Sequence, residues 1–382
     1  MGEDGRGIWR TAMNTAARIR NGGNRAGITL RVRSGQALLR PEAGGAQSGG
    51  VVKPPLQVLL MALLACFALV EAGAAQSETP KPALLVLNKD ASELAIVDPG
   101  TLKVVGRVPT GPIPHEVAAS EDGKIAVATN YGEHQNGTTL SVIDLDAQKE
   151  IHRVELKDLV GPHGVLFFDG KAWFTAEGSK KIARYDPVTN RVDWEYEIGE
   201  NRTHMLVMSR DGHTLFTSNV NSDSMTAVVA NTDKTKWTNA VIAVGKGPEA
   251  IDLSPDGLEV WAGNSGDGTV SIIDATTKKV KQTVNVATKH SNRLKFTPDG
   301  THVLISDPGS GELVVMDAAS RKEVKRLKLG KSPEGILIVP DGTKAFVAVS
   351  GDNKVAVVEL KNFTVVTTFE TGKDPDGMAW RE

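Results

Sequence analysis

The stretch SPEGILIVPDGTKAFVAVSGDNKVAVVEL (residues 332–360) consists of short apolar runs separated by turn-forming groups such as Pro-Asp-Gly. An upstream stretch, GPEAIDLSPDGLEVWAGNSGDGTVSIID (residues 247–274), has the same runs and turns in the same order. Self-similarity at a fixed spacing is the sequence signature of repeat architectures. A repeated structural unit therefore organises at least this part of the chain.

Two markers keep one period through most of the chain. The first is an Asp-Gly turn, whose aspartates are spaced 42 to 47 residues apart: Asp122, Asp169, Asp211, Asp256, Asp299 and Asp341. The second is a polar residue that ends an apolar run, with spacings of 42 to 46 residues: Asp98, Asp144, Asp186, Asn231, Asp274, Asp317 and Glu359. The agreement of the two markers indicates a genuine repeat.

Each unit has the pattern of four short strands. Runs rich in Val and Ile alternate with Gly, Asp, Asn and Pro, which favour turns. No stretch after residue 80 shows sustained helical periodicity. A four-stranded antiparallel unit of this length is typical of a β-propeller blade.

The number of blades follows from the two ends of the repeat. Six complete units begin near His115, His163, His204, Glu249, Asn292 and Glu334. The segment after Pro82 matches only the second to fourth strands of a unit, and residues 375–380 match only a first strand. The sequence therefore predicts an all-β, seven-bladed propeller of four-stranded antiparallel blades. The C-terminal strand seals the ring, which leaves no free pairing edge in the sealed sheet.

Residues 82–382 resemble the YVTN-repeat, YncE-type propellers. Residues 127–130 (Val-Ala-Thr-Asn) lie where that family carries its naming tetrapeptide, and residues 140–150 and 270–280 are similar to its third strand and following turn. GPHG at residues 161–164 is more distantly similar to motifs of streptogramin-lyase-like propellers. The resemblance implies a fold found in surface-layer and periplasmic proteins, and it does not fix an activity.

The first 75 residues have a different composition. Residues 58–70 form a short apolar run after Lys53 and before small residues, so residues 51–75 are predicted to be a signal peptide, with the propeller at 76–382. Residues 1–50 contain eight arginines and are either a mis-annotated start or a disordered or targeting leader. We expect a periplasmic or secreted product without a transmembrane segment. A lipoprotein anchored at Cys66 is the less favoured alternative.

Cysteine content and charge limit the kinds of site and partner that we expect. Cys66 is the only cysteine, so the exported chain would have no disulfide, thiolate nucleophile or cysteine metal ligand. Residues 76–382 carry 35 Lys and Arg against 42 Asp and Glu, which disfavours nucleic acid as a partner. We expect a monomer whose partner is a small molecule or a protein of the cell envelope.

The first position of each innermost strand is polar, and these positions converge on the channel axis of a propeller. Read around the ring, they are His115, His163, His204, Glu249, Asn292, Glu334 and Asp376. Imidazole and carboxylate groups bind divalent transition metals. We predict that His115, His163, His204 and Glu249 hold such an ion, the one cofactor that the sequence suggests. The alternative is a polar lining that a wet channel mouth requires. His163 lies six residues before its turn aspartate, whereas the others that precede such a turn lie seven residues before it. A one-residue shift in strand register would turn the His163 side chain away from the channel, so the prediction depends most on this position.

A second polar set ends the second strands: Asn88, Asn130, Glu177, Asn219, Asn264, Asp307 and Ser350. Such residues are first of all turn formers. We nevertheless predict a ligand-contacting group made of Asn130, Glu177, Asn219, Asn264, Asn292, Arg293, Asp307, Glu334 and Asp376.

No catalytic residue is identified. The sequence has no GxSxG, P-loop, GxGxxG or CxxCH motif in the required context. The leading hypothesis is a non-enzymatic exported propeller that binds a small molecule, metal ion or protein at the His-rich channel mouth. The alternatives are a metal-dependent lyase or hydrolase of a small cyclic or lactone-type substrate and a structural cell-envelope protein.

Overall fold

The computed structural model describes residues 78–382. The predicted leader, the signal peptide and Cys66 lie outside the described residues. Besides strands, the described part contains three single-turn 3-10 helices, η1 (Glu133–Gln135), η2 (Val220–Ser222) and η3 (Ser350–Asp352). None of its helices has the length and apolar character needed to cross a membrane.

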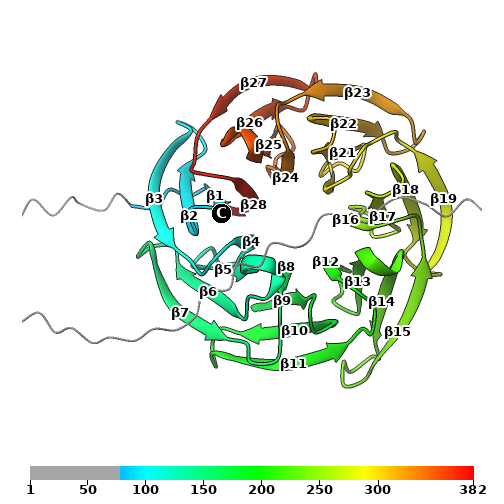
Figure 1. Ribbon diagram of the computed structural model, residues 1–382, viewed down its shortest axis with the longest axis horizontal. Coiled ribbons are helices and arrows are strands. Elements are labelled where there is room, and N and C mark those ends of the chain that lie inside the picture. Colours follow the sequence, from blue (N-terminus) through cyan, green and yellow to red (C-terminus); the bar gives the residue numbers. More distant parts are fainter. Residues whose placement is uncertain (1–77) are drawn as a thin grey trace, which may run out of the picture. The chain divides into compact units, whose positions relative to one another are not determined.

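Residues 78–382 form seven four-stranded antiparallel sheets arranged as a ring, which confirms the predicted seven-bladed propeller (Figure 1). We number these sheets as blades 1 to 7, each written from its innermost strand outward. Blade 1 contains β28 (Pro375–Arg381), β1 (Ala83–Asn88), β2 (Glu93–Asp98) and β3 (Lys103–Pro109). Blade 2 contains β4 (Pro114–Ala119), β5 (Ile125–Asn130), β6 (Thr139–Asp144) and β7 (Lys149–Glu155). Blade 3 contains β8 (Pro162–Phe168), β9 (Lys171–Ala176), β10 (Lys181–Asp186) and β11 (Arg191–Glu197).

The remaining blades follow the same order. Blade 4 contains β12 (Thr203–Met208), β13 (Thr214–Asn219), β14 (Ser224–Ala230) and β15 (Trp237–Ala243). Blade 5 contains β16 (Pro248–Leu253), β17 (Glu259–Asn264), β18 (Thr269–Asp274) and β19 (Lys279–Asn285). Blade 6 contains β20 (Arg293–Phe296), β21 (His302–Asp307), β22 (Glu312–Asp317) and β23 (Glu323–Lys328). Blade 7 contains β24 (Pro333–Ile338), β25 (Lys344–Val349), β26 (Lys354–Glu359) and β27 (Thr364–Phe369).

The hydrophobic core lies between neighbouring blades. The second and third strands of a blade are buried on both faces, as in β1 and β2, whereas outer strands such as β7 are largely exposed. One apolar cluster joins Val127 and Leu140 of blade 2 to Phe174 and Tyr185 of blade 3. Each blade therefore completes its core only against its neighbours, and the ring must close for the first and last blades to do the same.

The ring closes in blade 1, where the red C-terminal β28 lies beside the blue β1 (Figure 1). The two strands pair antiparallel, with Ala83 opposite Arg381. The carbonyl oxygen of Leu145 in blade 2 accepts hydrogen bonds from the Thr79 hydroxyl at 2.5 Å and the Arg381 guanidinium at 3.4 Å. Arg381 is fully buried and also pairs with Asp146. The segments at both ends of the described chain are thus fastened to one carbonyl of the next blade.

The hairpin of blade 3 explains the short spacing after His163. Asp169 and Gly170 form a two-residue turn with positive φ at both positions, which suits a tight hairpin. The corresponding connection in blade 2 has five residues, 120–124. The strand register is the same in both blades, since Val165 pairs with Phe174 as Val117 pairs with Ala128. The turn absorbs two missing residues, one before and one after the aspartate, and His163 keeps its expected position.

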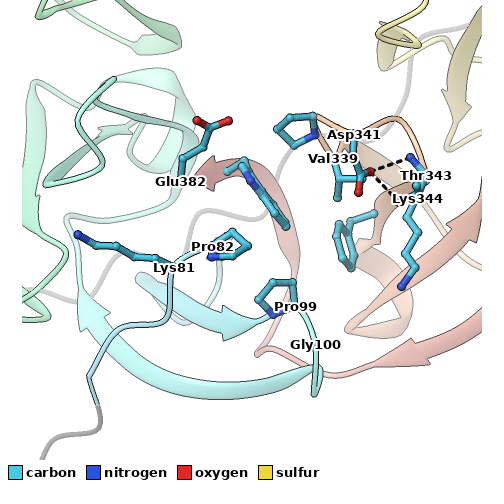
Figure 2. A pocket seen from close by; sticks show the side chains of 12 residues that line it. Lys81, Pro82, Pro99, Gly100, Val339, Asp341, Thr343, Lys344 and Glu382 are labelled. Atoms are coloured by element: carbon cyan, nitrogen blue, oxygen red, sulfur yellow. Dashed lines mark hydrogen bonds between the residues drawn. The ribbon is translucent and has the colours of Figure 1, made fainter.

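A cavity of about 560 Å³ lies at the seam between blades 7 and 1 (Figure 2). In blades 6 and 7 the glycine of the first hairpin lies over a proline of the preceding blade: a Cβ placed on Gly300 would be 3.5 Å from Pro255, and one on Gly342 would be 3.7 Å from Pro298. Blade 1 has no such hairpin, because β28 and β1 are not consecutive in the chain. Pro340 of blade 7 therefore borders the cavity.

Deletion of residues 375–382 should destabilise the whole ring. The change removes β28 with its buried apolar side chains, each worth about 1.5–3 kcal/mol, and exposes the edge of β1. We expect a fall in Tm of more than about 10 °C or loss of the cooperative transition, measured by circular dichroism. Removal of Glu382 alone, which is exposed, is the control. A deletion variant that keeps the native Tm would contradict closure by β28.

Candidate functional site

The innermost strands place the predicted polar residues at equivalent positions facing the channel. Six of these residues are the second residue of their strand: His115, His163, His204, Glu249, Glu334 and Asp376. Asn292 directly precedes β20. The repeat in the sequence therefore predicted the strand position of each of these residues. Which of them contact one another depends on their side chains.

Three imidazole rings form a contiguous row across blades 2, 3 and 4. The rings of His163 and His204 have centroids 3.8 Å apart, and those of His115 and His163 are 4.8 Å apart. His163 Nε2 lies 3.1 Å from His115 Nδ1, so one of these nitrogens donates a hydrogen bond to the other. The Tyr131 ring packs against both His115 and His163. This packing restricts the orientation of the imidazoles before any ligand arrives.

Glu177, which directly follows β9, joins this row to its surroundings. Its carboxylate contacts His204 Nδ1 and accepts a hydrogen bond from the Tyr131 hydroxyl. Arg202 Nε lies 3.6 Å away. Burial opposes ionisation of this carboxyl group, but the contact with His204, supported by Tyr131 and Arg202, outweighs it and lowers the pKa of Glu177. Glu177 is therefore a buried carboxylate whose oxygens already have partners.

Two ring nitrogens in the row have no partner. His163 and His204 are each 2% exposed, and His163 Nδ1 and His204 Nε2 make no hydrogen bond within residues 78–382. Burial holds the pKa of His163 well below its usual value and lowers the pKa of His115 to about 3. Neutral imidazoles with a free nitrogen are suited to metal binding. Potential ligand atoms of His163, Glu177 and His204 lie within 4.8 Å of one another.

Glu249 lies beside His204 on the next blade. Its Oε1 is 3.8 Å from His204 Nε2, and its Oε2 is 2.9 Å from Nε2 of the half-exposed His290. Asn292 donates a hydrogen bond of 3.1 Å to Oε1. Burial disfavours the charged carboxylate, but the hydrogen bond with His290 and the neighbouring His204 and Arg293 outweigh it and lower the pKa of Glu249 to about 2. Glu249 is therefore ionised at neutral pH.

The opposite side of the mouth, in blades 6, 7 and 1, is held by ion pairs. Arg293 of blade 6 reaches across to Glu116 of blade 2, and its Nη2 lies 3.7 Å from Asp376. Lys89 Nζ lies 2.5 Å from Glu334 and 3.4 Å from Asp376. Arg293, Glu334 and Asp376, which were predicted to contact a ligand, are part of this network.

The Asn and Asp residues that end the second strands bond within their own blades, and Glu177 differs from them because it lies one residue past the end of β9. The side-chain amides of Asn130, Asn219 and Asn264 donate hydrogen bonds to hydroxyl groups of the following strand in the same blade. Asp307 accepts hydrogen bonds from the backbone amides of Lys289 and His290. These hydrogen bonds stabilise blades and turns. They explain why Asn and Asp occur at these positions even without a bound ligand.

The sequence analysis missed three residues of the mouth: Lys89, Tyr131 and Glu116. Lys89 and Tyr131 each directly follow the polar residue at the end of a second strand, and Glu116 directly follows His115. Reading the repeat one residue farther at both positions would have found them. Glu116 and Arg293 also line a cavity of about 360 Å³ formed by later residues of the innermost strands, such as Met205 and Leu253.

Comparisons with known proteins bear on the fold. Residues 199–342, a little over a third of the chain, match the family described as Cytochrome D1 heme domain. No curated protein matches the chain. Among solved structures it is similar to the periplasmic gluconolactonase of Pseudomonas aeruginosa, with 17% identity and a TM-score of 0.66 over 79% of this chain and 99% of that one.

Two further solved structures give the same result. A putative 6-phosphogluconolactonase from Bacteroides uniformis has 16% identity and a TM-score of 0.66, covering 78% of this chain and 99% of its own. A chain of Kuenenia stuttgartiensis hydrazine synthase has 18% identity and a TM-score of 0.63, covering 76% and 98%. The chain is a seven-bladed β-propeller. Likeness at these identities shows the fold alone.

Stability should fall as the pH drops below about 6.5, because the buried imidazoles resist protonation. The pKa of His115 is 6.5 in a free chain and about 3 here, so below pH 6.5 the unfolded chain binds a proton that the folded chain does not. The loss approaches about 1.4 kcal/mol per pH unit for each such histidine. Urea unfolding with chelator at pH 7, 6 and 5 should show a shallower decline for His115→Gln than for the wild type. Equal slopes would contradict the buried neutral state.

Proposed function

We propose that this protein is an exported propeller of the YVTN or YncE type that binds one divalent transition-metal ion at the His-rich mouth of its channel. The observation that carries the proposal is the buried imidazole of His204, whose unpartnered Nε2 lies 3.8 Å from Glu249 Oε1. A buried polar atom without a hydrogen bond has a free-energy cost of about 1–3 kcal/mol. A bound ion would remove that cost by taking the free lone pair.

The surrounding groups favour a cation. Two carboxylates, Glu177 and Glu249, lie beside His204, and both have lowered pKa values. Imidazole together with carboxylate suits zinc, copper, nickel or iron. The match to the Cytochrome D1 heme domain includes His204 and Glu249 but not His115 or His163, so two of the three imidazoles in the row lie outside it. The donor set thus supports an ion more directly than it supports a heme.

Export, the monomeric state and a cell-envelope partner are parts of the same proposal. Export is supported by the apolar run at residues 58–70, and the acidic balance of residues 76–382 favours a partner other than nucleic acid. Metal-dependent hydrolysis or lyase activity on a small cyclic ester is the alternative. Glu249, ionised and beside the free His204 nitrogen, is the group that could take a proton from an attacking water.

Metal binding by the untagged, chelator-treated protein tests the proposal. The protein is incubated with zinc, copper or nickel and then dialysed. We expect about one equivalent of the ion to remain bound, measured by elemental analysis. His204→Gln should weaken binding about 100-fold or more, because it removes the unpartnered nitrogen. His152→Gln, on the exposed strand β7, is the matched control. Absence of a bound ion in the wild type, or equal binding by both variants, would overturn the proposal.

Turnover assays distinguish the alternative. Lactones and cyclic depsipeptides are offered to the metal-loaded and the chelated protein. We expect no turnover by either form. Metal-dependent turnover that is lost in His204→Gln would replace the binding function with an enzymatic one.

A further inference from the structure

We infer that the ion lies between His204 Nε2 and the Glu249 carboxylate, with His290 as a further ligand, and that Glu177 orients His204 without binding the ion. This inference rests on the proposed function and assigns roles within the same site. It differs both from the sequence-predicted set of three histidines with Glu249 and from the compact group of His163, Glu177 and His204.

The first argument concerns the space between potential ligands. Bonds of about 2 Å from an ion to each of two ligands hold those ligand atoms roughly 3–4 Å apart. His204 Nδ1 and Glu177 Oε1 are in direct hydrogen-bonding contact, which leaves no room for an ion between them. His204 Nε2 and Glu249 Oε1 are 3.8 Å apart. Only the second of these two gaps has the width that an ion requires.

The second argument concerns the orientation of His204. A metal-binding histidine commonly donates its other ring N–H to a carboxylate, which fixes the tautomer and the ring plane. Glu177 is placed for this role, because it contacts Nδ1 and is itself held by the Tyr131 hydroxyl. The buried, unpartnered Nε2 then faces Glu249. The His163 ring, tilted by 35° and with its centroid 3.8 Å from that of His204, restricts rotation of His204.

The third argument concerns the remaining ligand positions. His290 Nε2 lies 2.9 Å from Glu249 Oε2, a direct contact that His290 would leave in order to bind the ion, and its side chain is 45% exposed. It comes from the connection that precedes β20, so it can adjust more readily than a residue within a strand. Asn292 anchors Glu249 through Oε1, and a carboxylate oxygen can accept both this hydrogen bond and an ion. The exposed side of His290 leaves at least one coordination position open to water or to a small ligand.

Paired isosteric variants test the assignment of the two carboxylates. Glu249→Gln removes a ligand, and Glu177→Gln removes the orienting carboxylate. Cobalt(II) is the probe, because its visible absorption reports the coordination of the ion as well as its affinity. We expect Glu177→Gln to weaken binding about 10- to 100-fold with a wild-type spectrum. Glu249→Gln should weaken binding at least 10-fold more, and it should change the spectrum, as should His290→Gln.

The outcomes separate the inference from the proposed function. Glu370→Gln, on an exposed site without a described partner, is the control and should bind as the wild type does. Near-ultraviolet circular dichroism establishes that each variant is folded. If the wild type binds no ion, the proposed function fails. If the wild type binds and Glu177→Gln abolishes binding while Glu249→Gln leaves affinity and spectrum unchanged, metal binding stands and this inference is overturned. Wild-type affinity and spectra in all variants would also overturn it.

Discussion

Pairing of β28 with β1 is the constraint on which the rest of the molecule depends. A blade completes its core only against its two neighbours, so the ring has no stable end until the last strand joins the first blade. Closure also fixes the distance of every innermost strand from the axis. The imidazole row needs this geometry, since His115, His163 and His204 come from three different blades and touch only because those blades converge.

The mouth of the channel has two chemically different halves. On the side of blades 2 to 5, the imidazole row stands beside the carboxylates Glu177 and Glu249. On the side of blades 6, 7 and 1, the cations Lys89 and Arg293 are matched by carboxylates and hold the strands together across the channel. Each cation of the second half is paired with carboxylates, whereas in the first half the Glu249 carboxylate faces the unpartnered Nε2 of His204. A propeller with perfect sevenfold symmetry could not provide this difference.

The repeat made the fold and the positions of the inward-facing residues predictable, because a fixed period sets the backbone register of equivalent strands. It also allowed the short hairpin after His163 to be recognised as a local change. Side-chain partners were not predictable in the same way. Arg293 pairs with Glu116 across the ring, 177 residues away, and no periodic pattern specifies which blades face each other or which rotamers meet. Glu177 corresponds in register to Tyr131 and not to Asn130, because the hairpin of blade 3 is shorter. Its carboxylate therefore reaches His204, whereas the Asn130 amide bonds within its own blade.

The double attachment to the Leu145 carbonyl has a mechanical consequence. Ala83 and Arg381 lie opposite each other at the same end of the paired strands, so tension that separates these two residues would load the hydrogen bonds of β1 and β28 one after another. Such peeling resists force weakly, because only one bond carries the load at a time. Thr79 and Arg381, both bonded to Leu145 in blade 2, lie ahead of the first of these bonds and take up the tension before it. The two hydrogen bonds to the Leu145 carbonyl therefore protect the β1–β28 pair against separation from this end.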